Sequence, residues 1–532
     1  MNKRYYLTLF AVLTFRTLIF SQSFEWVHSN PVHYSLNPGL STYSVCTSSS
    51  GKIFASRLDS STLYFGSIYG VQKIDCYDYA QQLQWSYEAG QKAIIERVAS
   101  DPNGNLYAAG EFTDNLLLGD NDSLENSTGV NLNVDIFLFS LDPSGALRWK
   151  KNITVEHPGS TYFSCIRCDK QGNCWYGISD FSSSKIIRVD DSGQDVQTID
   201  ITGSRSLGSF DFDEQQNLFA TGSTEGGFTL SAGGLSVNVN DSYMMYVLRI
   251  NSSGQGSWIH LAHDVTFNQP SIICDPWSGA YLGGTLMDST SFGTTHFNGP
   301  QWVYDAFLTH VDSSGNFSWG IEVPHTATIE GDFEKGSNNF LDVDASGNVY
   351  MTGITRGHVD WGNGVVTGIG MPVQTSISIL SFDTNGIPRW SLDGYSNHFN
   401  SSYALAVDQQ GDCFFGSAVN DTAFFGTFSV NEGGGLAFVL GKISTPAPAS
   451  VNDIRNETHA NIFPNPAKDK VYIELNYTAG FFELHDITGK LLQENFIQFS
   501  KYELDMSHFG SGVYFLTVGD KNIQQHIKIL KE

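Results

Sequence analysis

Five histidines follow a tryptophan at a similar distance, five to eight residues further along the chain. A neutral imidazole offers a nitrogen lone pair, so histidines that meet on one surface could bind zinc or copper, or hydrogen-bond a sugar or a carboxylate. None of the five belongs to a tight metal motif such as His-x-Glu-x-x-His. The alternative is that they are solvated loop residues. These candidate ligand-binding residues are His33, His157, His263, His325 and His398.

Three acids at alternate positions of one segment, Glu330, Asp332 and Glu334, form the candidate metal site. Carboxylate oxygens suit calcium, which is the one cofactor that the sequence leaves open; no other cofactor is evident. The segment lacks the Asp-x-Asp-x-Asp-Gly string of a calcium loop, and a solvated acidic loop is the alternative. Two aromatic residues, Trp361 and Tyr395, could stack on sugar rings or anchor loops to the core. No catalytic constellation is evident.

The seven cysteines lie in apolar stretches. Cys165 and Cys168 fall on an expected strand and not at a helix start, so the geometry that activates a redox thiol is missing. We interpret the cysteines as small core side chains. A disulfide between Cys168 and Cys174 stays open for an oxidising compartment.

A repeated pattern indicates the elements that position these residues. A short apolar strand ends in an acid, a turn with Gly or Asn follows, and an aliphatic-aromatic strand begins. Asp closes such a turn with its side chain and Gly takes a positive φ, so each copy predicts a tight β-hairpin. The copies start at Asp101, Asp169, Asp213, Asp275, Asp344 and Asp408, with a weaker one at Ser48.

A second hairpin alternates with the first and carries a Trp seven residues after its leading Asp or Asn. In one copy Gln197 stands where Trp is expected, and the copy that ends at Ser444 stops before its Trp. Residues 24–28, which contain Trp26, are a candidate for that missing strand. The regular copies hold Trp85, Trp149, Trp258, Trp319 and Trp390.

Two hairpins per unit and seven units of about 60 residues predict an all-β fold, a seven-bladed β-propeller over residues 24–443. The strand around Trp26 would complete the last blade and close the ring, which protects sheet edges. The short turns fall on one face of the ring. We expect binding on the other face, at the channel mouth, because variable loops on a rigid scaffold carry function. The long connections of that face are residues 113–133, 224–243, 287–304, 324–339 and 356–375.

Two stretches carry a resemblance to a known family. Residues 305–319, Asp-Ala-Phe-Leu-Thr-His-Val-Asp-Ser-Ser-Gly-Asn-Phe-Ser-Trp, and 343–353, Val-Asp-Ala-Ser-Gly-Asn-Val-Tyr-Met-Thr-Gly, resemble the bacterial β-propeller repeat family of secreted proteins. The resemblance extends over residues 24–445. It implies a fold and no single activity.

The composition is typical of an exported β protein. Charged residues make up 16% of the chain and glycines number 53, which disfavours helical bundles, coiled coils and disordered chains. The formal net charge of −26 excludes nucleic acid as an expected partner. Residues 1–23 have the cations, apolar run and small-residue end of a signal peptide. No segment is apolar and long enough for a transmembrane span.

The C-terminal part differs in composition. Residues 444–459 contain the Pro and Ala spacing of an extended linker, and residues 460–532 alternate short strands with turns, which predicts a small β-sandwich. This sandwich resembles the type A C-terminal sorting domain of the type IX secretion system. The resemblance implies a Bacteroidota-type bacterium, the secretion machinery as a partner, and passage through the periplasm to the cell surface or medium. The matching residues include Pro464, Asn465, Pro466, Gly489, Gly512, Tyr514 and Lys528.

Export signals at both ends and the lack of a catalytic constellation favour a non-catalytic binding module for a glycan or a protein. One alternative is a secreted carbohydrate-active enzyme, a hydrolase or lyase, with its site on the long-loop face. For a hydrolase, paired carboxylates would be required. The other alternative is a structural or adhesion component of the cell surface.

Overall fold

The structure is a computed structural model of the 532-residue chain. The chain divides into two compact units, Met1–Pro446 and Ala447–Glu532. The expected signal peptide (1–23) lies outside the described residues except for its last two, and the expected linker (444–459) except for Ser444. No helix in the described part is long and apolar enough to cross a membrane. The structure describes residues 22–32, 43–64, 67–113, 115–119, 122–127, 134–153, 161–263, 270–286, 288–299, 305–324, 331–368, 375–396, 400–444, 460–475, 480–487, 490–497, 501–519 and 524–532.

The acid-led turns have the hydrogen bonds that their sequence predicts. At Asp169, the carboxylate accepts bonds from the backbone N–H groups of Gln171 and Asn173, both at 2.9 Å. The Gly172 N–H donates to the Asp169 carbonyl at 2.9 Å, with φ of +85° at Gly172, a conformation that favours glycine. The side chain therefore closes the turn and sets the hairpin register. The same pair of carboxylate bonds recurs at Asp101, Asp213, Asp275, Asp344 and Asp408.

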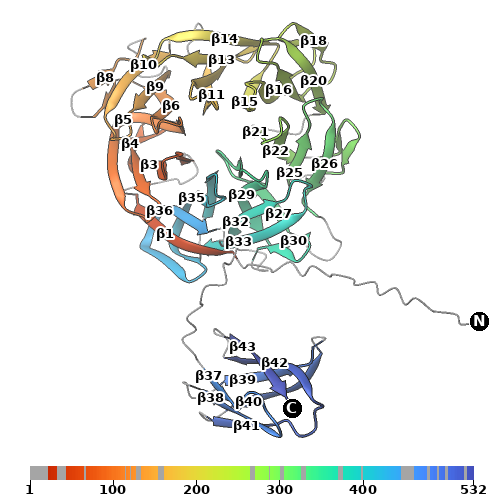
Figure 1. Ribbon diagram of the computed structural model, residues 1–532. Coiled ribbons are helices and arrows are strands. Elements are labelled where there is room, and N and C mark those ends of the chain that lie inside the picture. The colour runs from red at the N-terminus through yellow and green to blue at the C-terminus, as the bar shows by residue number, and fades with distance from the viewer. Residues whose placement is uncertain are drawn as a thin grey trace, which may run out of the picture. The chain divides into compact units, whose positions relative to one another are not determined.

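Strands of the Met1–Pro446 unit form groups of four antiparallel neighbours that resemble propeller blades and follow one another around a common centre (Figure 1). The first groups are β2 (Ser44–Thr47), β3 (Lys52–Tyr64), β4 (Ser67–Asp78) and the start of β5 (Leu83–Ser100), then the end of β5 with β6 (Leu106–Phe112), β9 (Asp135–Leu141) and β10 (Leu147–Ile153). Next come β11 (Tyr162–Cys168), β12 (Cys174–Ser179), β13 (Ser183–Val189) and β14 (Asp195–Thr202), then β15 (Ser206–Phe212), β16 (Leu218–Thr224), β19 (Met244–Ile250) and β20 (Gly256–His263).

The remaining groups continue the same order. They are β21 (Ser271–Cys274), β22 (Ala280–Leu286), β25 (Asp305–Val311) and β26 (Phe317–Glu322), then β28 (Leu341–Val343), β29 (Val349–Arg356), β32 (Thr375–Phe382) and β33 (Pro388–Ser396). The last contains β34 (Asn400–Val407), β35 (Cys413–Phe425), β36 (Phe428–Ser444) and β1 (Ser23–Pro31).

Several long connections contain short hairpins, although their sequence predicted irregular loops. Each hairpin lies between the second and third strands of its group. The pairs are β7 (Leu116–Leu118) with β8 (Asp122–Leu124), β17 (Thr229–Ala232) with β18 (Leu235–Asn238), β23 (Thr290–Phe292) with β24 (Thr295–Phe297), and β30 (Val359–Gly362) with β31 (Val365–Thr367). A further strand, β27 (Asp332–Lys335), pairs with the end of β29.

The core lies between neighbouring groups. Middle strands such as β9 are buried along their whole length, whereas the outer strand β14 is mostly exposed. One apolar cluster joins Tyr107 of β6 to Phe163 and Ile166 of β11, so it spans two consecutive groups. Each group therefore buries its apolar faces against its neighbours, as packed β-sheets do.

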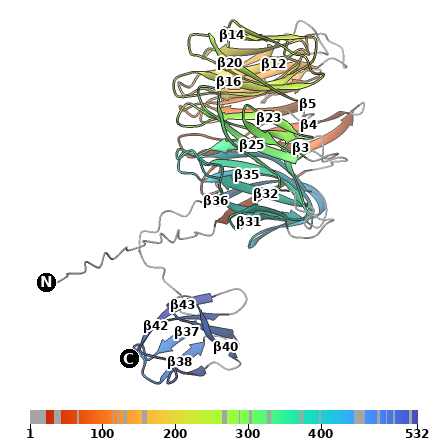
Figure 2. The ribbon, with the colours of Figure 1, turned by 90° about the vertical axis from the view of Figure 1, so that its right-hand side faces the viewer.

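The N-terminal strand belongs to the last group. β1 pairs antiparallel with β36 from Ser23 opposite Ser444 to Pro31 opposite Ala437. Both ribbon views place the red β1 beside the blue β36 (Figures 1 and 2). Lys442 adds ion pairs at 2.9 Å to Glu25 of β1 and at 2.9 Å to Asp412. Chain ends that are far apart in sequence thus share one sheet.

Tryptophans of the outer strands cover the acid-led turns of the following groups. Three indole Nε1 atoms donate to the carbonyl just after the leading acid: Trp85 to Pro143 at 3.1 Å, Trp258 to Ser313 at 3.1 Å and Trp319 to Thr384 at 3.0 Å. Trp26 makes the same bond to the Tyr79 carbonyl at 3.1 Å, after Asp78. It therefore has the position that the repeat predicts for the outer strand of the last group.

The Ala447–Glu532 unit contains two small sheets that share one apolar core. One sheet consists of β37 (Ala460–Phe463), β38 (Lys470–Leu475) and β41 (Lys501–Asp505). The other has the order β40 (Leu491–Ile497), β39 (Gly480–His485), β42 (Gly512–Gly519) and β43 (Gln524–Lys531). Val471 and Ile473 of the first sheet and Leu484 and Leu516 of the second belong to the shared core.

Candidate functional site

A cavity of about 330 Å³ lies where the innermost strands of several groups meet. Its lining comes from β5, β11, β15, β21 and β27 and from residues 337–340. In Figure 1 these strands lie around the common centre of the groups, and the cavity lies between them. Pro270 and Ser271 line it where β21 begins. We call this cavity the channel pocket.

Irregular strand pairing places side chains in the channel pocket. The register shifts immediately before Arg97 in β5, before Cys165 in β11 and before Ser209 in β15. A β-bulge interrupts the regular alternation and redirects the side chain that follows it. All three of these residues line the pocket. The bulge thus brings a guanidinium group into the pocket at a register where the next groups place Cys165 and Ser209.

Arg97 provides an unpaired cationic group at this site. Its Nε atom is buried and, among the described residues, has no hydrogen-bond partner. Burial lowers the pKa of Arg97 to about 10, so the group keeps its charge at neutral pH. A buried donor without an acceptor is costly, and a ligand that supplies an acceptor would relieve this cost.

Lys335, at the end of β27, is the second cation of the channel pocket. It is buried, its Nζ donates to the Gly336 carbonyl at 3.3 Å, and it lies 4.6 Å from the centre of the Phe340 ring. Burial and the nearby Arg97 charge lower the pKa of Lys335 to about 7. An anion between Arg97 and Lys335 would favour the charged form of Lys335 and so raise its pKa again.

The acid that lines the channel pocket already has a partner. Glu334 forms an ion pair with Arg356 at 3.1 Å, and Asp332 pairs with the same guanidinium group at 3.4 Å. Glu330, the third acid of the expected metal site, lies outside the described residues. Within the described ranges no group of three His, Cys, Asp or Glu side chains could hold a metal ion. The calcium site stays a prediction.

Only His263 of the five candidate histidines lies within the described part of the chain. It is exposed at the end of β20, opposite Met244. The structure therefore does not bring the histidines together at a described site. The others, His33, His157, His325 and His398, fall outside the described residues.

The two candidate aromatic residues differ in exposure. Trp361 lies in the β30–β31 hairpin, 7% exposed, with its ring edge-on to Phe333 and Phe382 and its Nε1 donating to Thr367 Oγ1 at 3.0 Å. Of the two alternatives for Trp361, a sugar surface or a loop anchor, its burial agrees with the anchor, because the hairpin folds this ring into the core. Tyr395 is half-buried at the end of β33, against Phe424.

All seven cysteines are free thiols, and five of them are buried. Cys168 and Cys174 lie directly opposite each other on β11 and β12. The burial of Cys76, Cys165, Cys174, Cys274 and Cys413 agrees with the interpretation of the cysteines as small core side chains.

A pair of acids near the channel has raised pKa values. Glu96 is the residue at the β5 bulge, and Glu111 lies on the neighbouring strand β6. Burial raises the pKa of both carboxyl groups, and the charge of Glu111 raises that of Glu96 further. Because the pKa of Glu96 is raised to about 8, its carboxyl group holds a proton at neutral pH.

Sequence reasoning missed Arg97 and Lys335. Arg97 leaves a signal in the repeat, because the position four residues before the leading acid holds Cys165, Ser209 and Ser271 in the next three copies. A charged side chain at a repeat position that points inward and elsewhere holds a small residue indicates a function or a charge partner. Lys335 has no such signal, since β27 lies outside the repeat.

The expected sorting motif ties the C-terminal strand to the start of its unit. Asn465 Nδ2 donates to the Lys528 carbonyl at 2.7 Å, and Asn465 Oδ1 accepts from the Leu530 N–H at 2.9 Å. Tyr514 donates to the Gly510 carbonyl at 2.7 Å. The remaining motif residues are Pro464 and Pro466, which flank Asn465, Gly512 at the start of β42, and Gly489 outside the described residues.

Comparisons with known proteins identify this C-terminal unit. The family described as secretion system C-terminal sorting domain matches residues 461–532. Among solved structures, a streptogramin B lyase is 10% identical, covers 78% of this chain and 97% of its own, and has a TM-score of 0.39. PorZ, a surface component of the type-IX secretion system of Porphyromonas gingivalis, is 12% identical. The match covers 91% of this chain and 73% of PorZ, with a TM-score of 0.32. The Dos1 propeller is 8% identical. The match covers 78% of this chain and 95% of the Dos1 chain, with a TM-score of 0.37. No curated protein sequence matches the chain.

The protein therefore combines a β-propeller-like fold, built from four-stranded sheets, with a C-terminal sorting domain of the type IX secretion system. The sorting domain identified from the sequence is confirmed. It indicates interaction with the secretion machinery and secretion across the outer membrane to the surface or medium.

Proposed function

We propose that this protein is an exported, non-catalytic binding propeller that holds an acidic glycan in its channel pocket. The observation that carries the proposal is the pair of cations, Arg97 and Lys335, in one cavity whose lining acid, Glu334, is already paired with Arg356. Arginine binds carboxylates through two parallel hydrogen bonds, and a buried lysine adds a point charge. A carboxylate is thus the group that the pocket fits best.

The rest of the pocket supports a sugar as the carrier of that carboxylate. Ser209, Ser271, Asn338 and Asn339 place hydroxyl and amide groups in the lining. These groups both donate and accept hydrogen bonds, as sugar hydroxyls require. The volume of about 330 Å³ admits the end of a chain and not a folded domain. A uronic acid at a glycan end combines the required features.

The architecture belongs to the same proposal. We propose seven blades over residues 24–443, with β1 closing the ring through its pairing with β36 and the Trp26 contact at Tyr79. Residues 1–23 are then a removable signal peptide, 444–459 a linker, and 460–532 a sorting β-sandwich. A closed ring holds the strands of the channel pocket at fixed distances, which pre-organises it for binding.

A glycan array with the full mature chain tests the function. We expect oligosaccharides that end in a uronic acid to bind and their neutral, carboxyl-reduced counterparts not to bind. Arg97→Gln should reduce the signal by about 10-fold or more, because a hydrogen bond to a charged group contributes about 1.5–3 kcal/mol. Glu503→Gln, on the C-terminal unit, is the matched control that should bind normally. Equal binding of acidic and reduced glycans would refute the proposal.

A hydrolase is the second candidate, favoured by the Glu96–Glu111 pair. A carboxyl group that stays protonated at neutral pH can act as a general acid in glycoside cleavage. The bound acidic oligosaccharide would then be recovered shortened, and Glu96→Gln would abolish the cleavage but not the binding. Recovery of intact oligosaccharide after long incubation excludes this candidate and leaves the binding proposal in place.

A further inference from the structure

One turn of the propeller-like unit lacks the indole that covers its counterparts. In β14, Gln197 lies opposite Arg188, the register at which Trp258 lies opposite Arg249 in the next group. The turn that an indole at position 197 would cover begins at Asn251. Its Ser252 carbonyl corresponds to the carbonyls of Pro143, Ser313 and Thr384, which accept indole N–H bonds elsewhere.

The surroundings of the glycines in these turns show how much space the missing indole leaves. A side chain built on Gly145 would approach the Trp85 indole to 2.7 Å, and one on Gly386 would approach Trp319 to 2.7 Å. At Gly254, the equivalent glycine beside Gln197, no atom lies within 4 Å of the same position. The replacement of Trp by Gln therefore opens a space between two groups on the short-turn face.

This space is a cavity of about 400 Å³, which we call the Gln197 slot. Such a volume lies within the range of small-molecule sites, roughly 300–1,000 Å³. Trp175 and Phe212 provide aromatic lining, with ring centres 4.8 Å apart. The polar lining consists largely of amide side chains: Gln171, Asn173, Gln197, Gln215, Gln216 and Asn251.

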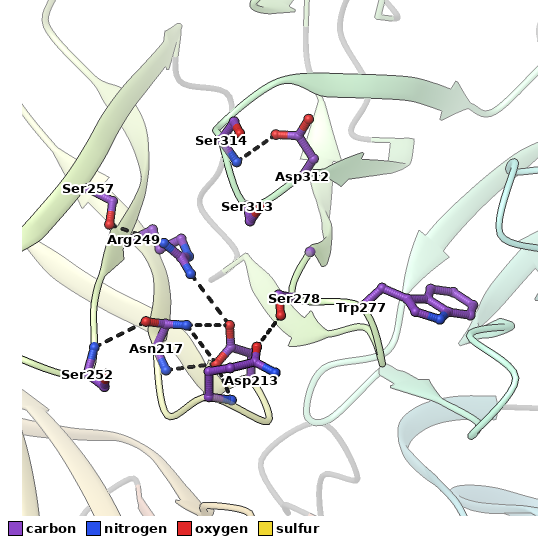
Figure 3. A network of polar contacts seen from close by, with 12 residues as sticks. Asp213, Asn217, Arg249, Ser252, Ser257, Trp277, Ser278, Asp312, Ser313 and Ser314 are labelled. Carbon is purple, nitrogen blue, oxygen red and sulfur yellow. Dashed lines mark hydrogen bonds and ion pairs between the residues drawn. The ribbon is translucent and has the colours of Figure 1, made fainter.

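Two buried donors in the slot lack acceptors. Within the described residues, neither Gln216 Nε2 nor Arg188 Nε has a hydrogen-bond partner. One wall is held in place by a polar network, in which Asn217 Oδ1 accepts from the Ser252 N–H at 3.1 Å and Asn217 Nδ2 donates to Asp213 at 2.8 Å (Figure 3). A rigid wall, unpaired donors and an aromatic floor together describe a pre-formed site.

We propose that the Gln197 slot binds a neutral pyranose unit of a glycan, as a second site that is separate from the channel pocket. Amides donate and accept hydrogen bonds in the same plane and match neighbouring sugar hydroxyls, while an aromatic ring covers the apolar C–H face of the sugar. A free aromatic side chain of a partner protein would fit an apolar slot better than this amide-rich one. The site does not depend on Arg97 or Lys335, since neither lines it.

The test restores the missing indole. Gln197→Trp in the full mature chain should fill the slot, keep or raise the melting temperature, and abolish binding. The probes are glucose, galactose, mannose, fucose, N-acetylglucosamine and N-acetylgalactosamine. Saturation-transfer NMR measures the binding of each sugar. We expect at least one of these sugars to bind the unmodified chain and to lose at least 10-fold in affinity in the variant. Thr198→Trp places an indole at the next position of β14 and should leave binding unchanged.

Further arms make the result decisive. If Gln197→Trp folds poorly, Arg188→Ala, which removes the unpaired Nε donor together with the Nη1 bond to Asn173 Oδ1, should weaken sugar binding about 10-fold. Arg97→Gln should leave neutral-sugar binding intact, which separates this inference from the channel proposal. The inference is overturned if no neutral sugar binds, if binding survives in Gln197→Trp, or if free indole binds the slot and none of the sugars does.

Discussion

Two cations in the channel pocket differ in how firmly they hold their charge. Arg97 stays protonated throughout the neutral range, whereas burial and the Arg97 charge place the pKa of Lys335 at about 7. Lys335 is thus charged below this pH and loses its proton as the pH rises through it. A carboxylate ligand is ionised over the whole range, so the pH dependence of binding comes from Lys335.

We predict that affinity for a uronate-terminated glycan falls by about 10-fold between pH 6 and pH 9. The bound carboxylate favours the charged ammonium, so the midpoint should lie above pH 7. Titration calorimetry at several pH values measures this. In Lys335→Arg the side chain stays charged, and the profile should be flat; a profile unchanged by this variant would contradict the role of Lys335.

The sequence could predict part of this site only. The position four residues before the leading acid makes Arg97 conspicuous, because the next three copies hold Cys165, Ser209 and Ser271 there. The β-bulge that redirects Arg97 and the pairing of β27 with β29 depend on tertiary contacts, which no local pattern encodes. For the same reason the sequence left Trp361 open between a sugar surface and a buried anchor, since the hairpin that buries it lies in a segment that resembles a loop.

At the scale of elements, hairpins and covering indoles explain most of the fold. The leading acid fixes each turn by local hydrogen bonds, so the turns were predictable from sequence alone. Trp85, Trp258 and Trp319 then join consecutive groups, because their indole N–H groups bond to a turn in the next group. Trp26 makes this contact from the last group to Tyr79 of the first group, and is buried.

We predict that Trp26→Ala lowers the free energy of unfolding by about 3–5 kcal/mol, the usual effect of truncating a buried Trp. Urea unfolding followed by circular dichroism measures the change. Trp277→Ala is the matched control, because this indole is 61% exposed, and it should change stability by less than about 1 kcal/mol. Equal effects of the two substitutions would contradict a covering role for Trp26.

A second element-scale prediction concerns the sorting domain. Asn465→Ala removes the acceptor of the Leu530 N–H, so hydrogen exchange at Leu530 should accelerate by about 10-fold or more. Exchange mass spectrometry of the full chain measures this. Asn495→Ala, which removes a bond to Tyr502 at the exposed surface, is the control and should leave β43 protected. Unchanged exchange in Asn465→Ala would show that the strand is held by other contacts.

The whole molecule is acidic, with a formal net charge of −26, although the channel pocket presents two cations. An acidic glycan is therefore repelled at long range and attracted only inside the channel. Salt screens the repulsion between exposed charges more than the contact within the buried pocket, since the screening length falls from about 30 Å at 0.01 M to about 8 Å at 0.15 M.

We predict that the association rate constant of a uronate-terminated glycan rises several-fold between 10 and 150 mM NaCl. Stopped-flow fluorescence with a labelled oligosaccharide measures this rate. A neutral sugar that binds the Gln197 slot should show no such dependence. A rate that falls with salt would mean that the cations govern the approach and that the acidic surface does not.

The most direct measurement is a double-mutant cycle on the uronate dissociation constant, with Arg97→Gln, Lys335→Gln and the combined variant at pH 6. If both cations bind one carboxylate, each single substitution weakens affinity by about 10-fold or more, and the combined loss differs clearly from the product of the two. Dissociation constants that stay unchanged in both single variants would contradict a ligand site in the channel.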